Sequence, residues 1–88
     1  MRINEQASRM DRFDRITFDP DIMAGQACIR GIRITVSLVL NLLANGQSAT
    51  EIIEEYSELE IEDIHQSLSY AAWLAAENVY VYPLKKAA

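Results

Sequence analysis

Few side chains of this 88-residue chain have the types and spacing that chemistry requires. The chain contains a single histidine, His65, and a single cysteine, Cys28. A cysteine and a histidine can act as nucleophile and base, but the pair needs a third group that orients the histidine and a site for an oxyanion, and neither is evident. We therefore expect His65 to be structural or to have its tip in solvent, and the protein not to be an enzyme.

The other signatures of a reactive site are also weak. The adjacent carboxylates Glu54-Glu55 and Glu62-Asp63 point in different directions on a helix, which is typical of a solvated face. No set of Cys and His residues has the spacing of a zinc site, and the three glycines stand at separate turns instead of forming a phosphate-binding loop. The sequence therefore predicts no catalytic residue, no metal, no cofactor and no small-molecule substrate.

The net charge of −5 conceals two unlike halves. Residues 1–35 hold six arginines, whereas residues 36–84 hold eight acidic residues and no lysine or arginine. A dense acidic surface suits a basic protein partner, although it can also serve only to keep the domain soluble. The candidate nucleic-acid contacts are arginines in and before an expected hairpin: Arg12, Arg15, Arg30 and Arg33. For Arg33 the alternative is a salt bridge that anchors the hairpin to an acidic helix, for example through Asp63.

The hairpin is expected around Gly31. Residues 27–29 and 33–35 are strand-forming runs on either side of this glycine, and glycine accepts the positive φ of a tight hairpin turn. The spacing leaves two loops open, in which Gly31 is paired either with Arg30 or with Ile32. A shift of one residue between them would exchange the faces of the side chains.

The rest of the chain predicts three helices. Thr35 is placed to cap a helix over residues 36–45, which Gly46 ends. Ser48-Ala49-Thr50-Glu51 is a capping box that begins a short helix, and a third helix is expected over residues 61–78. At 100° per residue, one face of the third helix carries the expected core residues: Ile61, Ile64, Leu68, Ala71, Ala72, Ala75 and Val79.

These elements predict an α+β, mostly helical domain over residues 16–82, with an N-terminal β-hairpin followed by a three-helix, winged-helix-like array. Residues 16–18 are a further strand candidate. Residues 1–15 are expected to form a flexible or helical arm, and residues 83–88 a tail. The sequence shows no signal-peptide pattern and no apolar run of the ~20 residues that cross a bilayer. We therefore expect a cytoplasmic protein without membrane contact.

A group of large apolar residues lies opposite the expected core face of the third helix: Tyr70, Trp73 and Leu74. Leu38 and Leu42 form a second stripe of this kind on the first helix. Grouped apolar side chains with Trp and Tyr usually mark an interface, so we expect a homodimer packed around Trp73. The alternative is that the N-terminal arm, or residues 79–82, folds over Trp73 within one chain.

Residues 42–52 resemble the first two helices of the helix-turn-helix array of bacterial DNA-binding proteins. Conventional binding would place the start of the third helix in the major groove. That segment carries carboxylates at Glu60, Glu62 and Asp63, which phosphates repel, and only Gln66 is a suitable reader of bases. DNA contacts are therefore expected from the arginines and not from this helix.

A more specific resemblance covers residues 16–76. Their landmarks resemble the domain of unknown function 433 family: Asp19-Pro20, Gly25, Ile29, Gly31, Arg33-Ile34, Val36, Leu42-Leu43, Gly46, Ser48, Glu51-Ile52, Tyr56, Leu59, Glu62-Asp63-Ile64 and Tyr70-Ala71-Ala72. The chain departs from the usual family pattern at Gln26-Ala27, Ile32 and Glu60-Ile61. Members of the family are small and winged-helix-like, and many look like VapB-type antitoxins encoded beside PIN-type ribonuclease toxins.

The resemblance implies a non-catalytic, antitoxin-like component of a type II toxin–antitoxin pair that binds a PIN-type ribonuclease and regulates its own operon. Two alternatives remain open. One is a stand-alone helix-turn-helix-like transcriptional regulator that binds operator DNA through the hairpin and arm. The other is an orphan dimeric scaffold.

Overall fold

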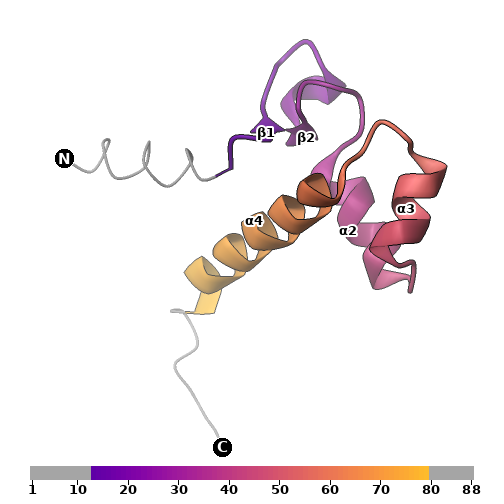
Figure 1. Ribbon diagram of the computed structural model, residues 1–88. Coiled ribbons are helices and arrows are strands. Elements are labelled where there is room, and N and C mark those ends of the chain that lie inside the picture. Colours follow the sequence, from indigo (N-terminus) through magenta and orange to yellow (C-terminus); the bar gives the residue numbers. More distant parts are fainter. Residues whose placement is uncertain (1–12, 80–88) are drawn as a thin grey trace, which may run out of the picture.

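The computed structural model describes residues 13–79. Two short strands come first, β1 at Ile16–Thr17 and β2 at Cys28–Ile29, with a turn of 3-10 helix at Met23–Gly25 between them. Three helices follow: α2 at Val36–Ala44, α3 at Ala49–Glu55 and α4 at Ile61–Val79. Figure 1 shows the strands above the start of α4, with α2 and α3 together on the other side of it. The predicted α+β, mostly helical fold with a hairpin before three helices is confirmed.

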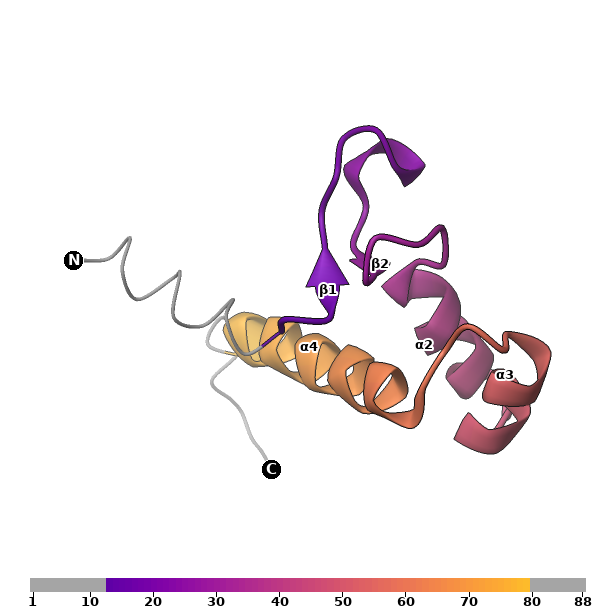
Figure 2. The same ribbon diagram turned by 45° about the horizontal axis from the view of Figure 1, so that its top comes forward.

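The strand pairing differs from the prediction. β2 pairs with β1, antiparallel, with Ile16 opposite Ile29 and Thr17 opposite Cys28 (Figure 2). The predicted pairing of residues 27–29 with 33–35 is reduced to one isolated bridge between Cys28 and Thr35. β2 therefore lies between two neighbours, and the further strand candidate at the start of the domain supplies its main partner.

The tight turn after β2 shows which of the two possible loops the chain forms around Gly31. The Ile32 N–H donates to the carbonyl of Ile29 at 2.8 Å, which makes Arg30 and Gly31 the two central residues. Both have positive φ, 44° at Arg30 and 76° at Gly31, as a type I′ turn requires. The Gly31 N–H also donates to the Thr17 hydroxyl at 2.9 Å, which ties the turn to β1.

The predicted helix ends are confirmed. The Thr35 hydroxyl accepts from the Leu38 N–H at 3.0 Å and caps α2. Ser48 and Glu51 make both halves of the capping box at the start of α3, with distances of 3.1 Å and 2.8 Å. These bonds satisfy backbone N–H groups that the first turn of a helix otherwise leaves unpaired.

The core lies where the three helices meet the hairpin. Its buried members are Phe13, Ile16, Ile29, Ile34, Val36, Val39, Ile52, Leu59 and Ile64. The predicted core face of α4 is only partly correct, because Ile61 and Leu68 remain 44% and 46% exposed. The residues that α4 buries include two polar ones, Asp63 and Ser67. A helical wheel drawn from hydrophobicity assigns every carboxylate and hydroxyl to the solvent side, so it cannot predict that Asp63 and Ser67 face the core.

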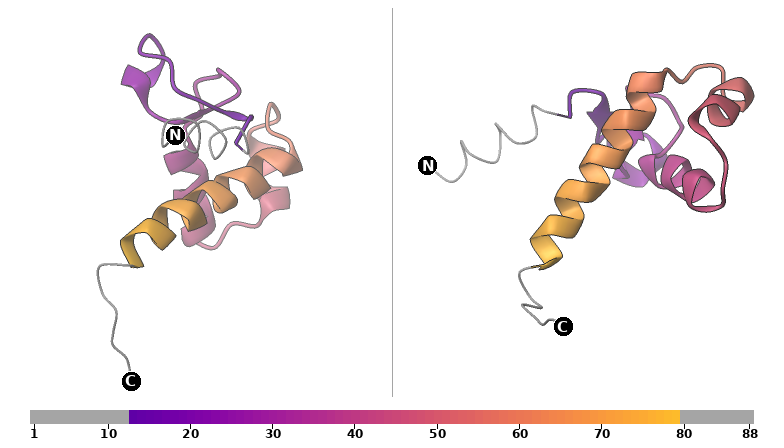
Figure 3. Two further views of the ribbon diagram at one scale, coloured as in Figure 1. Left: turned by 90° about the vertical axis from the view of Figure 1, so that its left-hand side faces the viewer. Right: turned by 60° about the horizontal axis from the view of Figure 1, so that its bottom comes forward.

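The second half of α4 extends past α2 and α3, as the views in Figure 3 show. None of the helices among residues 13–79 is long and apolar enough to cross a membrane. The predicted tail and most of the predicted arm, with Arg12, lie outside the described residues.

Candidate binding surfaces

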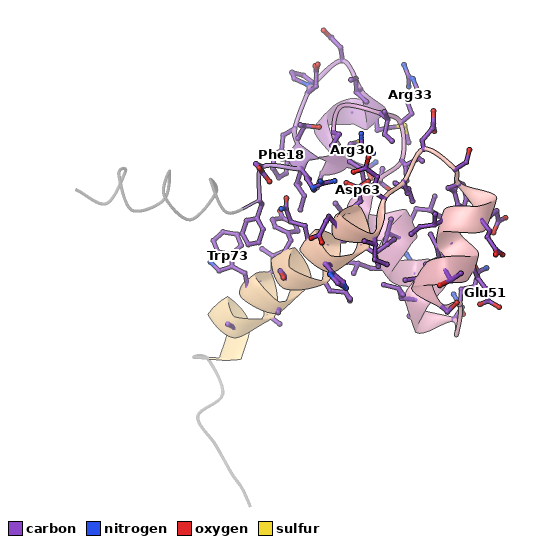
Figure 4. The ribbon with its side chains drawn as sticks, viewed as in Figure 1. Phe18, Arg30, Arg33, Glu51, Asp63 and Trp73 are labelled. Atoms are coloured by element: carbon purple, nitrogen blue, oxygen red, sulfur yellow. The ribbon has the colours of Figure 1, made fainter. Side chains whose placement is uncertain are left out.

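Asp63 is the centre of an ion cluster between the hairpin and the helices. It lies in the first turn of α4, and its side chain is fully buried. Its Oδ1 accepts from Arg15 Nη1 at 2.9 Å and from Arg30 Nε at 3.0 Å. Its Oδ2 accepts from Arg30 Nη2 at 2.9 Å and from the Glu60 N–H at 2.8 Å. Figure 4 shows Arg30 and Asp63 together at the start of α4.

The two arginines lie side by side at the same end of the antiparallel strand pair, so the cluster fastens that end of the hairpin. Arg15 precedes β1 and also binds the Glu60 carboxylate at 2.9 Å. Arg30 follows β2 and also donates to the carbonyl of Glu58 at 2.7 Å. The Arg30 N–H in turn donates to the carbonyl of Arg15 at 2.8 Å. This bonding holds the turn before α4 against the hairpin.

The cluster is fully ionised at neutral pH. Burial by itself would raise the pKa of Asp63, but hydrogen bonds from Arg30, from the Glu60 backbone and from Arg15 outweigh burial and lower it. Hydrogen bonds from Arg15 to Glu60 and to Asp63 raise the pKa of Arg15. The hydrogen bond to Asp63 likewise raises the pKa of Arg30. The charges of both arginines are therefore committed to carboxylates of the same chain.

The candidate arginines for nucleic-acid contact are therefore of two kinds, paired and exposed. Arg15 and Arg30 are paired in the cluster, whereas Arg33 is exposed, with its Nη1 3.9 Å from the sulfur of Met23. The predicted salt bridge between the hairpin and Asp63 therefore exists, but Arg33 was the wrong donor. Arg30 could not be identified as the donor from the spacing, because the spacing left open whether Gly31 is paired with Arg30 or with Ile32 in the loop.

An acidic face covers α3, the turn after it and the first turn of α4. We call it the acidic face, and its members are exposed carboxylates: Glu51, Glu54, Glu55, Glu58 and Glu62. Figure 4 places Glu51 on the far side of the molecule from Trp73. Glu60 is exposed beside this face but is held by Arg15. A conventional recognition helix would thus present carboxylates to DNA, as expected.

An apolar groove of about 530 Å³ runs between α2 and α4. We call it the α2/α4 groove, and its lining residues are Gln26, Ala27, Val36, Ser37, Leu40, Asn41, Ala44, Tyr70, Ala71 and Leu74. None of these residues carries a charge. Two residues of the predicted interface, Tyr70 and Leu74, lie here.

A second groove, of about 540 Å³, lies on another side of α4 and contains Trp73. Its other lining residues are Phe13, Glu62, His65, Gln66, Ser69 and Ala72. The Trp73 ring lies 5.6 Å from the ring of Phe13 and 6.0 Å from that of Tyr70, measured between centroids. Phe13 thus partly covers Trp73 within the chain. Leu38 and Leu42 are half-buried against the core and line neither groove.

The candidate reactive residues lie apart. Cys28 is buried in the hairpin, and His65 is exposed on α4, so they form no dyad. Within residues 13–79, no group of three or more His, Cys, Asp or Glu side chains could hold a metal ion.

Residues 16–71 match the family described as Protein of unknown function (DUF433). The chain belongs to this family. Comparisons with curated proteins and with solved structures find no match. The DUF433 segment contains Arg30 and Asp63 but begins one residue after Arg15, and it reaches Ala71 but not Leu74. The family segment therefore holds the centre of the ion cluster and most of the α2/α4 groove.

Proposed function

We propose that this DUF433 protein is a non-catalytic binding protein whose acidic face docks on a basic protein. In its specific form, the role is that of a VapB-type antitoxin, the partner is a PIN-type ribonuclease, and control of its own operon is a secondary role. The observation that supports the proposal is the charge of the domain. Residues 13–79 contain eleven acidic residues and three arginines, and two of those arginines are bound to carboxylates of the same chain.

The acidic face suits a ribonuclease for a physical reason. An enzyme that binds the phosphates of RNA needs a basic surface. The exposed carboxylates on α3, in the turn after it and at the start of α4 would compete for the same surface, and opposite potentials also speed the encounter of the two proteins. The ion cluster contributes indirectly, because it removes Arg15 and Arg30 from the surface potential.

DNA binding is the second candidate, and exposed Arg33 is the feature that favours it. The start of α4, where a recognition helix would read bases, carries Glu60 and Glu62. Arg15 and Arg30 would have to leave Asp63 to reach a phosphate. A stand-alone regulator would therefore depend on Arg33 and on arginines outside the described residues. An orphan scaffold, the third alternative, would bind neither a nuclease nor DNA.

The test is co-expression with a neighbouring gene that encodes a PIN-type nuclease. We expect the chain to relieve growth inhibition and to co-purify with the nuclease at ~0.1 M salt, with weaker recovery at ~0.5 M, since salt screens exposed charges. Glu54→Lys should weaken the complex, because it reverses one charge of the acidic face. Asp21→Lys is the matched control: it makes the same change at an exposed residue of the loop between β1 and β2.

Two results would count against the proposal. One is a nuclease that inhibits growth equally with and without the chain. The other is a complex that Glu54→Lys and Asp21→Lys weaken to the same degree, since only net charge would then matter. A mobility shift on promoter DNA that Arg33→Ala abolishes, without any nuclease complex, would favour the regulator instead.

A further inference from the structure

We propose that the α2/α4 groove is the surface through which two copies of this chain pair. The inference is independent of the nuclease partner. It also moves the expected dimer interface away from Trp73, because Trp73 lies in the second groove, beside Phe13.

The shape of the α2/α4 groove allows it to bind a copy of itself. Its α2 wall contributes Leu40 and Ala44, and its α4 wall contributes Ala71 and Leu74. Leu74 is 44% exposed and projects as a large apolar side chain, whereas the two alanines leave room opposite a partner. A two-fold axis places the Leu74 of each copy against the α2 wall of the other. A contact of this type closes on itself, since both copies use the same patch.

The distribution of charge favours a second copy of the chain as the occupant of the α2/α4 groove. Two copies of a domain with eleven acidic residues and three arginines in residues 13–79 repel each other over most of their surface, and like charges placed together cost several kcal/mol. The chain carries no charged residue from position 34 to position 50, which includes all of α2. Since none of the lining residues carries a charge, two acidic copies can meet at the groove without opposing carboxylates among those residues.

The same argument separates the groove from other occupants. A basic partner gains no ion pair from a groove without charges, and its natural target is the acidic face. The second groove is a poorer place for self-association, because pairing there would bring Glu62 of each copy toward the other. The second half of α4 also extends past α2 and α3 (Figure 3), and Leu74 in that half is exposed to a neighbouring chain.

The test is the oligomeric state of the full chain without any other protein, measured by light scattering and by sedimentation over roughly 10–100 µM, where weak dimers form. We expect wild type to reach twice the 10.0 kDa of one chain. Leu74→Glu should raise the dimer dissociation constant at least tenfold, because each dimer would bury two carboxylates in an apolar contact. Thermal melts should show that the variant is folded.

Leu68→Glu is the matched control. It changes the same residue type on the same helix at 46% exposure, against 44% for Leu74, and Leu68 does not line the groove. It should dimerise as wild type does. Ser69→Glu introduces a carboxylate into the second groove and should also leave the dimer intact.

Three results would overturn the inference. The first is a wild type that stays monomeric throughout, as it would if another part of the chain occupied the groove or if the groove were shaped for a different protein. The second is a Leu74→Glu variant that dimerises as well as Leu68→Glu. The third is a dimer that Ser69→Glu dissociates and Leu74→Glu does not, which would assign self-association to the second groove. None of these results depends on whether a nuclease partner exists.

Discussion

Replacing Asp63 by asparagine changes one buried charge with almost no change of shape. Both carboxylate oxygens accept hydrogen bonds, from Arg15, from Arg30 and from the Glu60 N–H. An asparagine has one acceptor oxygen, and its NH2 group would face donors on the other side. Asp63→Asn therefore leaves at least one guanidinium without its anion and disturbs the first turn of α4.

The size of the effect follows from burial. Removing one partner of a buried ion pair costs about 3–5 kcal/mol. The Asp63 side chain is fully buried, but those of Arg15 and Arg30 are 28% and 35% exposed, so water can partly rehydrate them. We therefore expect the free energy of unfolding to fall by about 2–3 kcal/mol. For a domain of this size, that lowers the melting temperature by roughly 10–20 °C.

The effect depends on pH in a defined direction. The pKa of Asp63 is lower in the folded state than its ordinary value of 3.8. The unfolded chain therefore takes up the proton first as pH falls, and the stability that Asp63 adds is present above that ordinary value. It is lost as pH falls through the lower, folded-state pKa. The difference in melting temperature between wild type and Asp63→Asn should therefore be constant near neutral pH and should narrow as pH falls below 3.8 through the folded-state pKa of Asp63.

The assay is thermal unfolding followed by circular dichroism at one protein concentration. Glu62→Gln is the matched control, because it removes the adjacent, exposed carboxylate in the same turn of α4. The control should stay within about 0.5 kcal/mol of wild type. An Asp63→Asn variant with the same melting temperature as Glu62→Gln would refute the reasoning, since water would then replace everything that the cluster contributes to stability.

Two further predictions concern local backbone features. Gly31→Val should destabilise the domain by roughly 1–3 kcal/mol, because φ is +76° at Gly31 and a β-branched residue resists that conformation. The cost should be purely conformational, since a Cβ there meets nothing within 4 Å; Gly31→Asn should therefore recover most of the melting temperature, and an equal loss in both variants would contradict this. Ser48→Ala should cost about 1 kcal/mol through loss of the α3 cap, measured by urea unfolding against Ser57→Ala, an exposed serine in the turn after α3. A Ser48→Ala midpoint equal to that of Ser57→Ala would mean that the cap is not needed.

The features that could be predicted from the sequence are local ones. The caps at Thr35 and Ser48 and the positive φ of Gly31 each depend on residues within a few positions of one another. The strand pairing of β1 with β2 joins residues eleven or more positions apart, and a motif around Gly31 contains no information about it. The loop between the strands also contains Met23 and Ala24 at positive φ, which neither side chain signals.

The ion cluster could be predicted only in part: the sequence suggested a salt bridge from the hairpin to Asp63, but from Arg33 and not from Arg15 and Arg30. Asp63 stands in a run of carboxylates, Glu60, Glu62 and Asp63, that look alike in sequence. What distinguishes Asp63 is that α4 turns it toward the hairpin, and this depends on Arg15 and Arg30, which lie 48 and 33 positions earlier. Once Asp63 is turned inward, Ser67, one helical turn later, is buried too, and its hydroxyl donates to the Asp63 carbonyl at 2.9 Å. As a result, the buried face of α4 differs from the predicted apolar face, and Ile61 and Leu68 stay exposed.

This difference also explains why the predicted interface divides into two. Turning Asp63 and Ser67 inward brings Tyr70 against the core and places Trp73 beside Phe13. Leu74 lies one turn after Tyr70 on the same face of α4, at the edge of the uncharged α2 and away from the groove that contains Trp73. The buried charge thus has consequences at both ends of the helix. At the start of α4, Asp63 binds two arginines, so the carboxylates around it form an acidic face. Further along the helix, the aromatic residues around Trp73 stabilise one chain, and the α2/α4 groove is left for a second copy to fill.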